Sequence, residues 1–250
     1  MKSVVIIPAR YASTRLPKKL LLCETGKPLI QHTYESASKA TLPTSITVAC
    51  DHEEIFRAVQ HFGGAVQMTD PNAPSGTDRI AEVAAALDGV DIVVNVQGDE
   101  PEIAGTSIDL AIQMLLDNPD AVMSTLATPI RSQQQLEDTA CVKVVFDAKG
   151  RALYFSRSVI PHPRGGIQEE HFDCAVPLFY QHIGLYAYRR EFLLLLSRLP
   201  QSETEKAESL EQLRVLHHGY SLMVGVIDEA TVGIDTPDDY QKFVEKQRGM

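Results

Sequence analysis

Residues 4–19 have the sequence VVIIPARYASTRLPKK, and this stretch decides the fold. Its apolar start, residues 4–7, predicts a short buried strand that ends at Pro8, because proline cannot donate to a sheet ladder. The next segment, which we call the cationic loop (residues 10–19), carries four positive side chains: Arg10, Arg15, Lys18 and Lys19. In an open α/β sheet, the loop after the first strand borders the ligand crevice.

The composition of the cationic loop favours a polyphosphate ligand. Arginine forks grip phosphate oxygens, lysine adds a point charge, and small residues between them let backbone N–H groups come close. A solvated basic turn is the alternative for this loop taken alone. The chain as a whole is acidic, with a net charge of −10. That charge disfavours nucleic-acid partners and anionic membranes, and the cationic loop reverses its sign locally.

Length and composition predict an ordinary globular protein. The 250 residues suit one large α/β domain, or one domain with an appended lobe. No apolar run is long enough to span a membrane, and the start is too short for a signal-peptide core. The cysteines lack C-x-x-C spacing, which indicates reduced thiols: Cys23, Cys50, Cys141 and Cys174. We therefore expect a cytoplasmic protein without membrane insertion.

Strand-like and helix-like segments alternate along the chain, which predicts βαβ units. The expected fold is a Rossmann-like, open, mostly parallel sheet with helices on both faces and a smaller lobe inserted in the second half. Further strands are predicted at residues 46–50, 65–68, 92–96, 122–127, 142–146, 183–188 and 222–227. Helices are predicted at residues 28–39, 53–62, 75–87, 110–116 and 205–217, and from residue 237 onward. The span 160–181 is predicted to be an irregular loop.

Carboxylates are expected to face the cationic loop. Asp99, in the segment VQGDEP, follows the predicted strand at 92–96 and so shares its edge of the sheet; Gly98 beside it permits close backbone approach. A carboxylate facing bound phosphates suits Mg²⁺. Asp235, in VGIDTPDD, is the candidate second carboxylate. The alternative for Asp99 is an acidic turn, and the alternative for Asp235 is a helix cap.

Other polar clusters fit a nucleoside and a sugar acid. The segment SGTDR, residues 75–79, offers hydroxyls and backbone donors for a base or ribose, and ordinary helix capping explains it nearly as well. In the second half, polar side chains could line a pocket for a polyhydroxylated acid, with Arg157 as a carboxylate fork. Structural roles are the alternative for these residues: Arg157, His182, Tyr186, Glu211 and Gln212.

Two common nucleotide folds are disfavoured. A dinucleotide dehydrogenase needs G-x-G-x-x-G after its first strand, and residues 8–13, PARYAS, contain no glycine. A P-loop needs G-x-x-x-x-G-K-[ST], which residues 26–28, GKP, do not provide.

The sequence resembles the 3-deoxy-manno-octulosonate cytidylyltransferases (CMP-Kdo synthetases), which are nucleotidyltransferases of bacterial lipopolysaccharide synthesis. The resemblance covers nearly the whole chain in the family's order. It is carried by IIPARYASTRLPKK, ACDHEEI, SGTDRIAEV, NVQGDEP, VKVVFDAKGRALYFSRSVIP, HIGLYAY, LEQLRVL and GIDTPDD. It implies that the chain transfers CMP from CTP to the anomeric hydroxyl of 3-deoxy-D-manno-octulosonate (Kdo), giving CMP-Kdo and pyrophosphate.

The resemblance also implies roles for individual residues. Mg²⁺ is expected on Asp99 and Asp235, and the catalytic set is expected to be Arg10, Lys19, Asp99 and Asp235. The nucleotide is expected at Ala9, Arg10, Ser13, Thr14, Arg15, Lys19, Ser75, Gly76, Thr77, Arg79 and Gln97. The sugar acid is expected at Gln97, Arg157, His182, Tyr186, Glu211 and Gln212.

The implied organisation is one nucleotidyltransferase domain over residues 1–250, forming a homodimer. Residues 1–130 would mainly bind CTP, and residues 150–220 would mainly bind the sugar acid and dimerise. The chain departs from the family pattern LPGKPL, because Lys18 replaces a glycine and Leu20 a proline. Residues 165–176 match poorly, which leaves open a related acceptor such as 8-amino-Kdo or a sialic acid. A non-catalytic nucleotide-binding module is the alternative from a different class, and the intact acidic and basic loops disfavour it.

Overall fold

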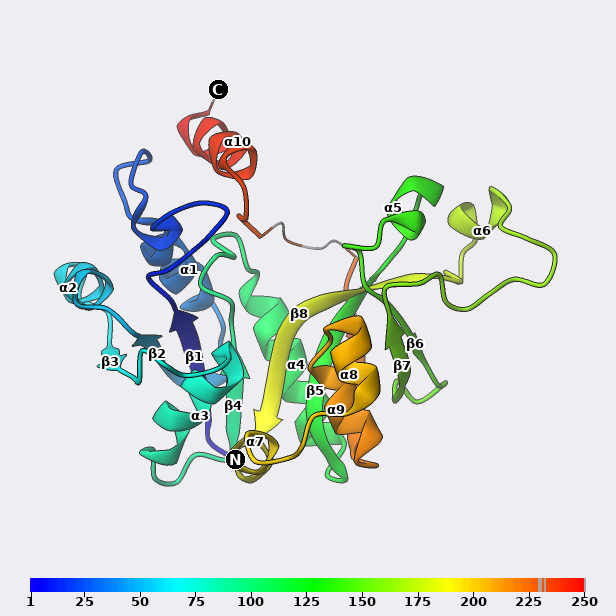
Figure 1. The fold of residues 1–250 in the computed structure, drawn as a ribbon, viewed down its shortest axis with the longest axis horizontal. Coiled ribbons are helices and arrows are strands. Elements are labelled where there is room, and N and C mark those ends of the chain that lie inside the picture. The colour runs from blue at the N-terminus through cyan, green and yellow to red at the C-terminus, as the bar shows by residue number, and fades with distance from the viewer. Residues whose placement is uncertain (229–230, 232, 250) are drawn as a thin grey trace. The chain divides into compact units, whose positions relative to one another are not determined.

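The computed structural model describes residues 1–228, 231 and 233–249 (Figure 1). The chain divides into two compact units. Unit 1 comprises Met1–Ile112 and Thr231–Met250, and unit 2 comprises Gln113–Ala230. Within the described residues, no helix has the length and apolar composition needed to cross a bilayer.

The sheet of unit 1 is parallel, as predicted. Its strands run in the order β3-β2-β1-β4. They are β1 (Ser3–Ala9), β2 (Pro43–Cys50), β3 (Val66–Met68) and β4 (Ile92–Asn95). Every residue of β1 and β4 is buried, as expected for β-branched strands covered on both faces of a parallel sheet.

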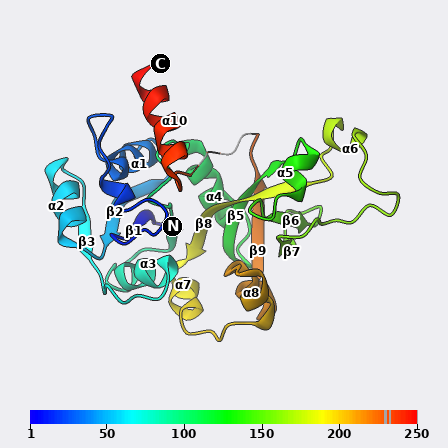
Figure 2. The ribbon, with the colours of Figure 1, turned by 45° about the horizontal axis from the view of Figure 1, so that its top comes forward.

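Helices cover both faces of this sheet. The helices of unit 1 are η1 (Lys19–Leu21), α1 (Leu29–Ala37), α2 (Glu53–His61), α3 (Gly76–Ala85), the start of α4 (Gly105–Asp117) and α10 (Pro237–Arg248). Figure 2 shows α1 and α3 on opposite faces, as right-handed crossovers require when the strand order reverses after β3. Of the two candidate caps of α3, Ser75 and Thr77, the N-cap is Ser75, whose side chain accepts the N–H of Asp78. Helix α4 begins earlier than the predicted residue 110.

Unit 2 is built around a central strand, β5, which is antiparallel to β8 and parallel to β9. β6 is antiparallel to both β7 and β8. The strands are β5 (Ala121–Pro129), β6 (Lys143–Phe146), β7 (Ala152–Ser156), β8 (Tyr180–Arg189) and β9 (Ser221–Val226). The helices are α5 (Gln133–Glu137), α6 (Glu170–Asp173), α7 (Arg190–Leu196), α8 (Glu203–Glu208) and α9 (Gln212–His217).

The prediction of one helix over residues 205–217 is wrong. The chain forms α8 and α9, which are separated at Ser209, where φ is 52° and ψ is 48°. This left-handed conformation ends a helix. A buried ion pair between Glu205 and Arg214 joins the two helices, with the Arg214 Nε 2.8 Å from the Glu205 Oε2.

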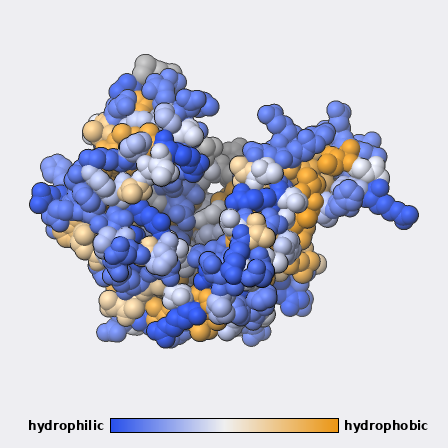
Figure 3. Space-filling model, in the orientation of Figure 1, coloured by the Kyte–Doolittle hydropathy of each residue, from blue (hydrophilic) through white to orange (hydrophobic). Residues whose placement is uncertain are grey.

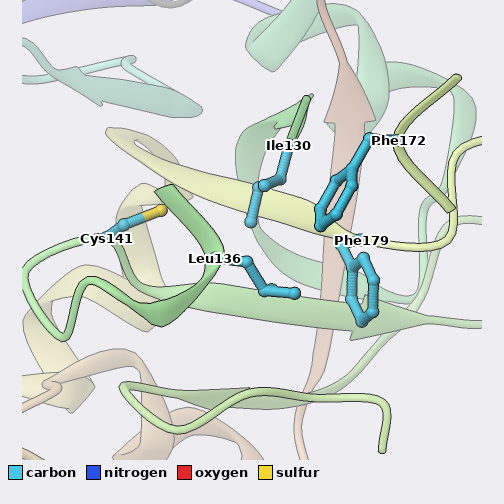
Figure 4. Packing of buried hydrophobic residues seen from close by; sticks show 5 residues of the cluster. All are labelled: Ile130, Leu136, Cys141, Phe172 and Phe179. Atoms are coloured by element: carbon cyan, nitrogen blue, oxygen red, sulfur yellow. The ribbon is translucent and has the colours of Figure 1, made fainter. Parts of the chain in front are cut away.

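The span 160–181, predicted to be irregular, contributes to the core of unit 2. It contains α6, and both Phe172 and Phe179 are buried. Their rings pack in one hydrophobic cluster with Ile130, Leu136 and Cys141 (Figure 4). Apart from the four-residue α6 and the first residues of β8, the span is irregular, as predicted, and its buried aromatic side chains supply apolar area to the core.

Candidate active site

Unit 1 contains a polar cavity of about 560 Å³ near the carboxyl ends of β1 and β4. It brings together residues that are far apart in the sequence. The lining residues are Pro8, Arg10, Ala12, Ser13, Thr14, Arg15, Lys19, Leu20, Pro74, Ser75, Gly76, Gln97, Gly98, Asp99 and Asp235. Sequence reasoning missed the apolar members Pro8, Ala12, Leu20 and Pro74. The only sequence feature that could have indicated them is their position in or beside the cationic loop and the segment SGTDR.

The cavity forms because β1 and β4 are neighbouring parallel strands, paired from Ser3 opposite Ile92 to Ile6 opposite Asn95. The segments that follow the two strands therefore leave from the same edge of the sheet. Gly98 lies directly against the end of β1. A Cβ on this residue would be 2.9 Å from the carbonyl oxygen of Pro8, so the close backbone approach expected of this glycine is present.

The replacement Gly98→Ala should destabilise the protein by about 1–3 kcal/mol, because the added methyl overpacks a backbone contact. It should also lower activity, since the shift moves the neighbouring Asp99. Urea unfolding measures the first effect. Gly184→Ala is the matched control, because a Cβ at Gly184 meets no atom within 4 Å. Equal stability of the two variants would contradict the argument.

Lys19 is the electrostatic centre of the cavity. Its ammonium lies 2.5 Å from the Asp99 Oδ2 and 2.9 Å from the Asp235 Oδ1, and it donates to the carbonyl of Ile234 at 3.1 Å. Burial acts to lower the pKa of Lys19, but the hydrogen bonds and charges of Asp99 and Asp235 outweigh it and raise the pKa above its ordinary value. Arg15 adds a second cation, with its Nη2 2.9 Å from the Asp235 Oδ2.

Asp235 is held in place by the start of α10 without serving as its cap. The N-cap is Thr236, which forms a capping box with Asp239. The Asp239 carboxylate also accepts the N–H of Asp235 at 3.2 Å. The Asp235 side chain is therefore left to pair with Lys19 and Arg15, and the capping alternative for this residue is excluded.

Glu100 follows Asp99 in the sequence but does not line the cavity. Burial raises the pKa of Glu100 to about 7, and the charge of Asp99 adds to this effect. A hydrogen bond from the Thr231 hydroxyl, at 3.3 Å, opposes the rise. Of the two adjacent carboxyl groups, only Asp99 lines the cavity.

The donor set of the cavity fits Mg²⁺. Two carboxylates converge on one ammonium, so their oxygens also lie within reach of a single small cation. Among the described residues, no group of three or more His, Cys, Asp and Glu side chains is arranged to hold a metal. Mg²⁺ does not need such a group, because it usually takes one or two carboxylates and completes its shell with phosphate and water oxygens.

Three residues expected at the nucleotide do not line the cavity. Ala9 is buried in β1, and Thr77 is buried in the first turn of α3. Arg79 is 1% exposed, and its guanidinium donates to the Thr69 hydroxyl and to Asp51, 3.2 Å away. Arg79 therefore links the residue that follows β2, Asp51, to the residue that follows β3, Thr69.

The residues expected at the sugar acid all lie in unit 2, apart from Gln97. The Tyr186 hydroxyl lies 3.4 Å from the Gln212 Oε1, and the rings of Tyr186 and His182 are 5.4 Å apart. Glu211 directly precedes α9, and the buried Gln212 Nε2 has no hydrogen-bond partner within the described chain. Such an orphaned donor is a candidate contact for a ligand.

Arg157 is fixed through main-chain groups. Its Nε donates to the carbonyl of Glu208 at 2.7 Å, and its Nη1 donates to the carbonyl of Thr139 at 3.0 Å. The Glu208 carboxylate accepts the Arg157 N–H at 2.9 Å and the Ser156 hydroxyl at 2.6 Å. These carbonyls orient the guanidinium, and no carboxylate of the described residues forms an ion pair with it.

His182 is buried in unit 2, with its Nε2 2.9 Å from the Thr125 hydroxyl oxygen. Burial lowers the pKa of His182 from 6.5 to about 3. In the unfolded chain, His182 therefore binds a proton below about pH 6.5. In the folded chain, it binds this proton only below about pH 3. The free energy of unfolding falls as the pH drops through this window.

The expected loss for wild type between about pH 7 and about pH 5 is about 2 kcal/mol from this residue alone. Urea unfolding gives the free energy of unfolding at each pH in that range. Between about pH 7 and about pH 5, this free energy should fall by about 2 kcal/mol less in His182→Gln, whose amide can still bond Thr125. An unchanged slope in the variant would assign the acid sensitivity to other groups.

Comparisons with known proteins identify the family of the chain. A family model described as "Cytidylyltransferase" matches residues 4–223. The 3-deoxy-manno-octulosonate cytidylyltransferase of Geotalea daltonii is 48% identical over 100% of both chains. That of Rhodopirellula baltica is 43% identical over 98% of each.

Solved structures support the same grouping. A CMP:2-keto-3-deoxy-manno-octonic acid synthetase complexed with CTP superposes with a TM-score of 0.91, at 40% identity, over 100% of this chain and 99% of that one. The 4-diphosphocytidyl-2C-methyl-D-erythritol synthase of Anaerococcus prevotii, at 13% identity and a TM-score of 0.61, shares the fold alone; the match covers 100% of this chain and 99% of that one. The predicted mostly parallel α/β nucleotidyltransferase fold is confirmed.

Proposed function

Because the chain belongs to the family of 3-deoxy-manno-octulosonate cytidylyltransferases, we propose that it transfers CMP from CTP to the anomeric hydroxyl of Kdo and releases pyrophosphate. The observation that carries this proposal is the cavity of unit 1, where the cationic loop faces Asp99 and Asp235 across Lys19. The CMP-Kdo formed would serve lipopolysaccharide synthesis in the cytoplasm.

The proposed reaction is an in-line displacement. The anomeric oxygen bonds to the α-phosphorus of CTP, the bond from that phosphorus to the bridging oxygen of the β-phosphate breaks, and the hydroxyl proton passes to solvent. The protein mainly positions two anions and neutralises the charge that develops. Arg10 and Lys19 hold the leaving pyrophosphate, and Ser13, Thr14 and Arg15 hold the other phosphate oxygens.

Asp99 and Asp235 would hold Mg²⁺. When bound, this ion supplies Lewis-acid charge neutralisation and lowers the pKa of a coordinated hydroxyl. The two carboxylates fix its place, and Lys19 and Arg15 keep both carboxylates oriented toward the cavity.

We assign the cytidine to Ser75, Gly76 and Gln97, beside the amino end of α3. Thr77 and Arg79 support this segment from the buried side. In unit 2, the sugar acid would contact Arg157 through its carboxylate, with hydroxyls on His182, Tyr186, Glu211 and Gln212. Unit 1 is therefore proposed to bind CTP, and unit 2 to bind the acceptor.

We also propose that the chain forms a homodimer through unit 2. Large apolar side chains of this unit are exposed, including Leu153 at 61% and Val176 at 80%. Figure 3 shows hydrophobic residues gathered over β6, β7 and the region of α6. Covering such a patch with a second copy removes apolar surface from water. Light scattering after size-exclusion chromatography tests the expected mass of two chains.

A coupled pyrophosphate assay tests the function. With CTP and Mg²⁺, the protein should release pyrophosphate with Kdo, and chelation by EDTA should abolish the release. The acceptor panel includes 8-amino-Kdo and a sialic acid; faster turnover with either of these would reassign the acceptor. CTP binding without pyrophosphate release from any acceptor would identify a non-catalytic nucleotide-binding module.

A further inference from the structure

Glu54, on the first turn of α2, contacts both ends of the cationic loop. Its Oε1 accepts the hydroxyl of Tyr11, near the start of the loop, at 2.6 Å. Its Oε2 accepts the ammonium of Lys18, near the end of the loop, at 3.2 Å. One carboxylate therefore closes the loop on itself. None of these three residues lines the cavity.

The Tyr11 end of the loop is fixed by the segment that leads into α2. The Tyr11 N–H donates to the Asp51 Oδ1 at 2.8 Å, and the Tyr11 ring stacks on His52 with centroids 3.6 Å apart and planes at 13°. Asp51 is anchored in turn by the buried Arg79. Tyr11 is therefore held through its backbone, its ring face and its hydroxyl, all by residues 51–54.

The Lys18 end is in an unusual conformation. Its φ of 53° and ψ of 30° lie in the left-handed region, which a residue with a Cβ adopts at a cost. Its ammonium lies 5.0 Å from the centroid of the Tyr11 ring as well as beside Glu54. Lys18 immediately precedes η1, so its backbone sets the direction in which Lys19 enters the cavity. Contacts that fix the position of Lys18 therefore also limit the positions that the Lys19 backbone can take.

We propose that Glu54 is a positioning residue, which holds the cationic loop in the conformation that presents Arg10, Arg15 and Lys19 to the triphosphate of CTP. The inference rests on the proposed function. Glu54 and Lys18 are about half exposed, at 50% and 53%, so their pairing contributes little to the stability of the fold. The pairing instead raises the fraction of molecules in which the cationic loop has the conformation that binds CTP. The apparent affinity for CTP is proportional to that fraction.

The test compares three variants by pyrophosphate release, with CTP and Kdo titrated separately, and by thermal unfolding. Glu54→Ala removes both bonds, whereas Glu54→Gln keeps an acceptor for Tyr11 and removes the ion pair. Glu53→Ala is the matched control, since the Glu53 carboxylate pairs with Arg57 and contacts neither end of the loop. We expect the KM for CTP to rise about tenfold in Glu54→Ala and about threefold in Glu54→Gln, with the KM for Kdo and the Tm unchanged.

Two results overturn the inference: a wild-type KM for CTP in Glu54→Ala, or an equal rise in both KM values together with a lower Tm, which would indicate a merely structural role. If the wild-type protein releases no pyrophosphate, the proposed function fails separately. Calorimetric affinity for CTP then replaces KM. Weaker binding by Glu54→Ala than by Glu53→Ala still supports the positioning role, and equal binding overturns it.

Discussion

Replacement of Asp99 by asparagine is expected to lower the rate of pyrophosphate release about 10³-fold, equivalent to about 4 kcal/mol of transition-state stabilisation. Asparagine keeps the shape of the side chain and removes its charge. One of the two anionic ligands of the proposed Mg²⁺ is lost, and Lys19 keeps its pairing with Asp235. The fold should be unaffected, because the Asp99 side chain is partly exposed and only its ionic contact changes.

The measurement is a Mg²⁺ titration of the coupled assay at saturating CTP and Kdo. The variant should need more Mg²⁺ and should stay slow when Mg²⁺ is saturating. Glu102→Gln is the control, because Glu102 follows the same strand and pairs with Lys246 on the surface. Wild-type turnover in Asp99→Asn would remove Asp99 from the proposed metal site.

Replacement of Lys19 by methionine is expected to lower kcat/KM about 10²-fold or more, a loss typical of removing one preorganised electrostatic contact. Methionine preserves the packing of the stem, but leaves the carboxylates of Asp99 and Asp235 without their shared cation. It also removes the ammonium group that we propose to hold the leaving pyrophosphate. Because the pKa of Lys19 is raised, its ammonium stays charged at neutral and mildly alkaline pH. The loss should therefore be the same from about pH 6 to about pH 9.

Lys27→Met is the matched control for this variant. Lys27 belongs to the same unit, and its ammonium pairs with Glu35 at 2.7 Å on the surface. This exchange should leave kcat/KM near the wild-type value, since an exposed pair contributes little. A loss in Lys19→Met that disappears at high pH would indicate that wild-type Lys19 deprotonates in this range, contrary to the direction of its pKa shift.

The parts of the fold that sequence reasoning predicted correctly are governed by local chemistry. β4 is a β-branched run without polar interruption, and Ser75 caps α3 through its own hydroxyl. The meeting of the cationic loop with Asp99 followed from one topological rule, that adjacent parallel strands end at the same edge. Those predictions needed no knowledge of distant packing.

The failures arose where tertiary contacts override local pattern. Apolar spacing across residues 205–217 fits one helix, but the ion pair of Glu205 with Arg214 favours a break at Ser209. α7 was missed because it follows β8 directly, without an intervening turn. β7 was missed although the turn at residues 147–150, with Gly150 at a φ of 79°, separates it from β6. The conformation of Lys18 was also beyond prediction, because its ion-pair partner Glu54 lies on α2, 36 positions away in the sequence.

The last segment of the described chain, residues 233–249, returns to unit 1. The bond between Lys19 and Asp235 spans 216 positions, and Tyr240 and Arg248 bond to Glu24. A ribosome releases the chain from its amino end, so the parallel sheet of unit 1 can assemble while unit 2 is still being synthesised. The second carboxylate, Asp235, is synthesised only after the whole of unit 2. A chain that ends before residue 235 therefore presents Asp99 to the cationic loop without Asp235, and it lacks one of the two carboxylates proposed to hold Mg²⁺.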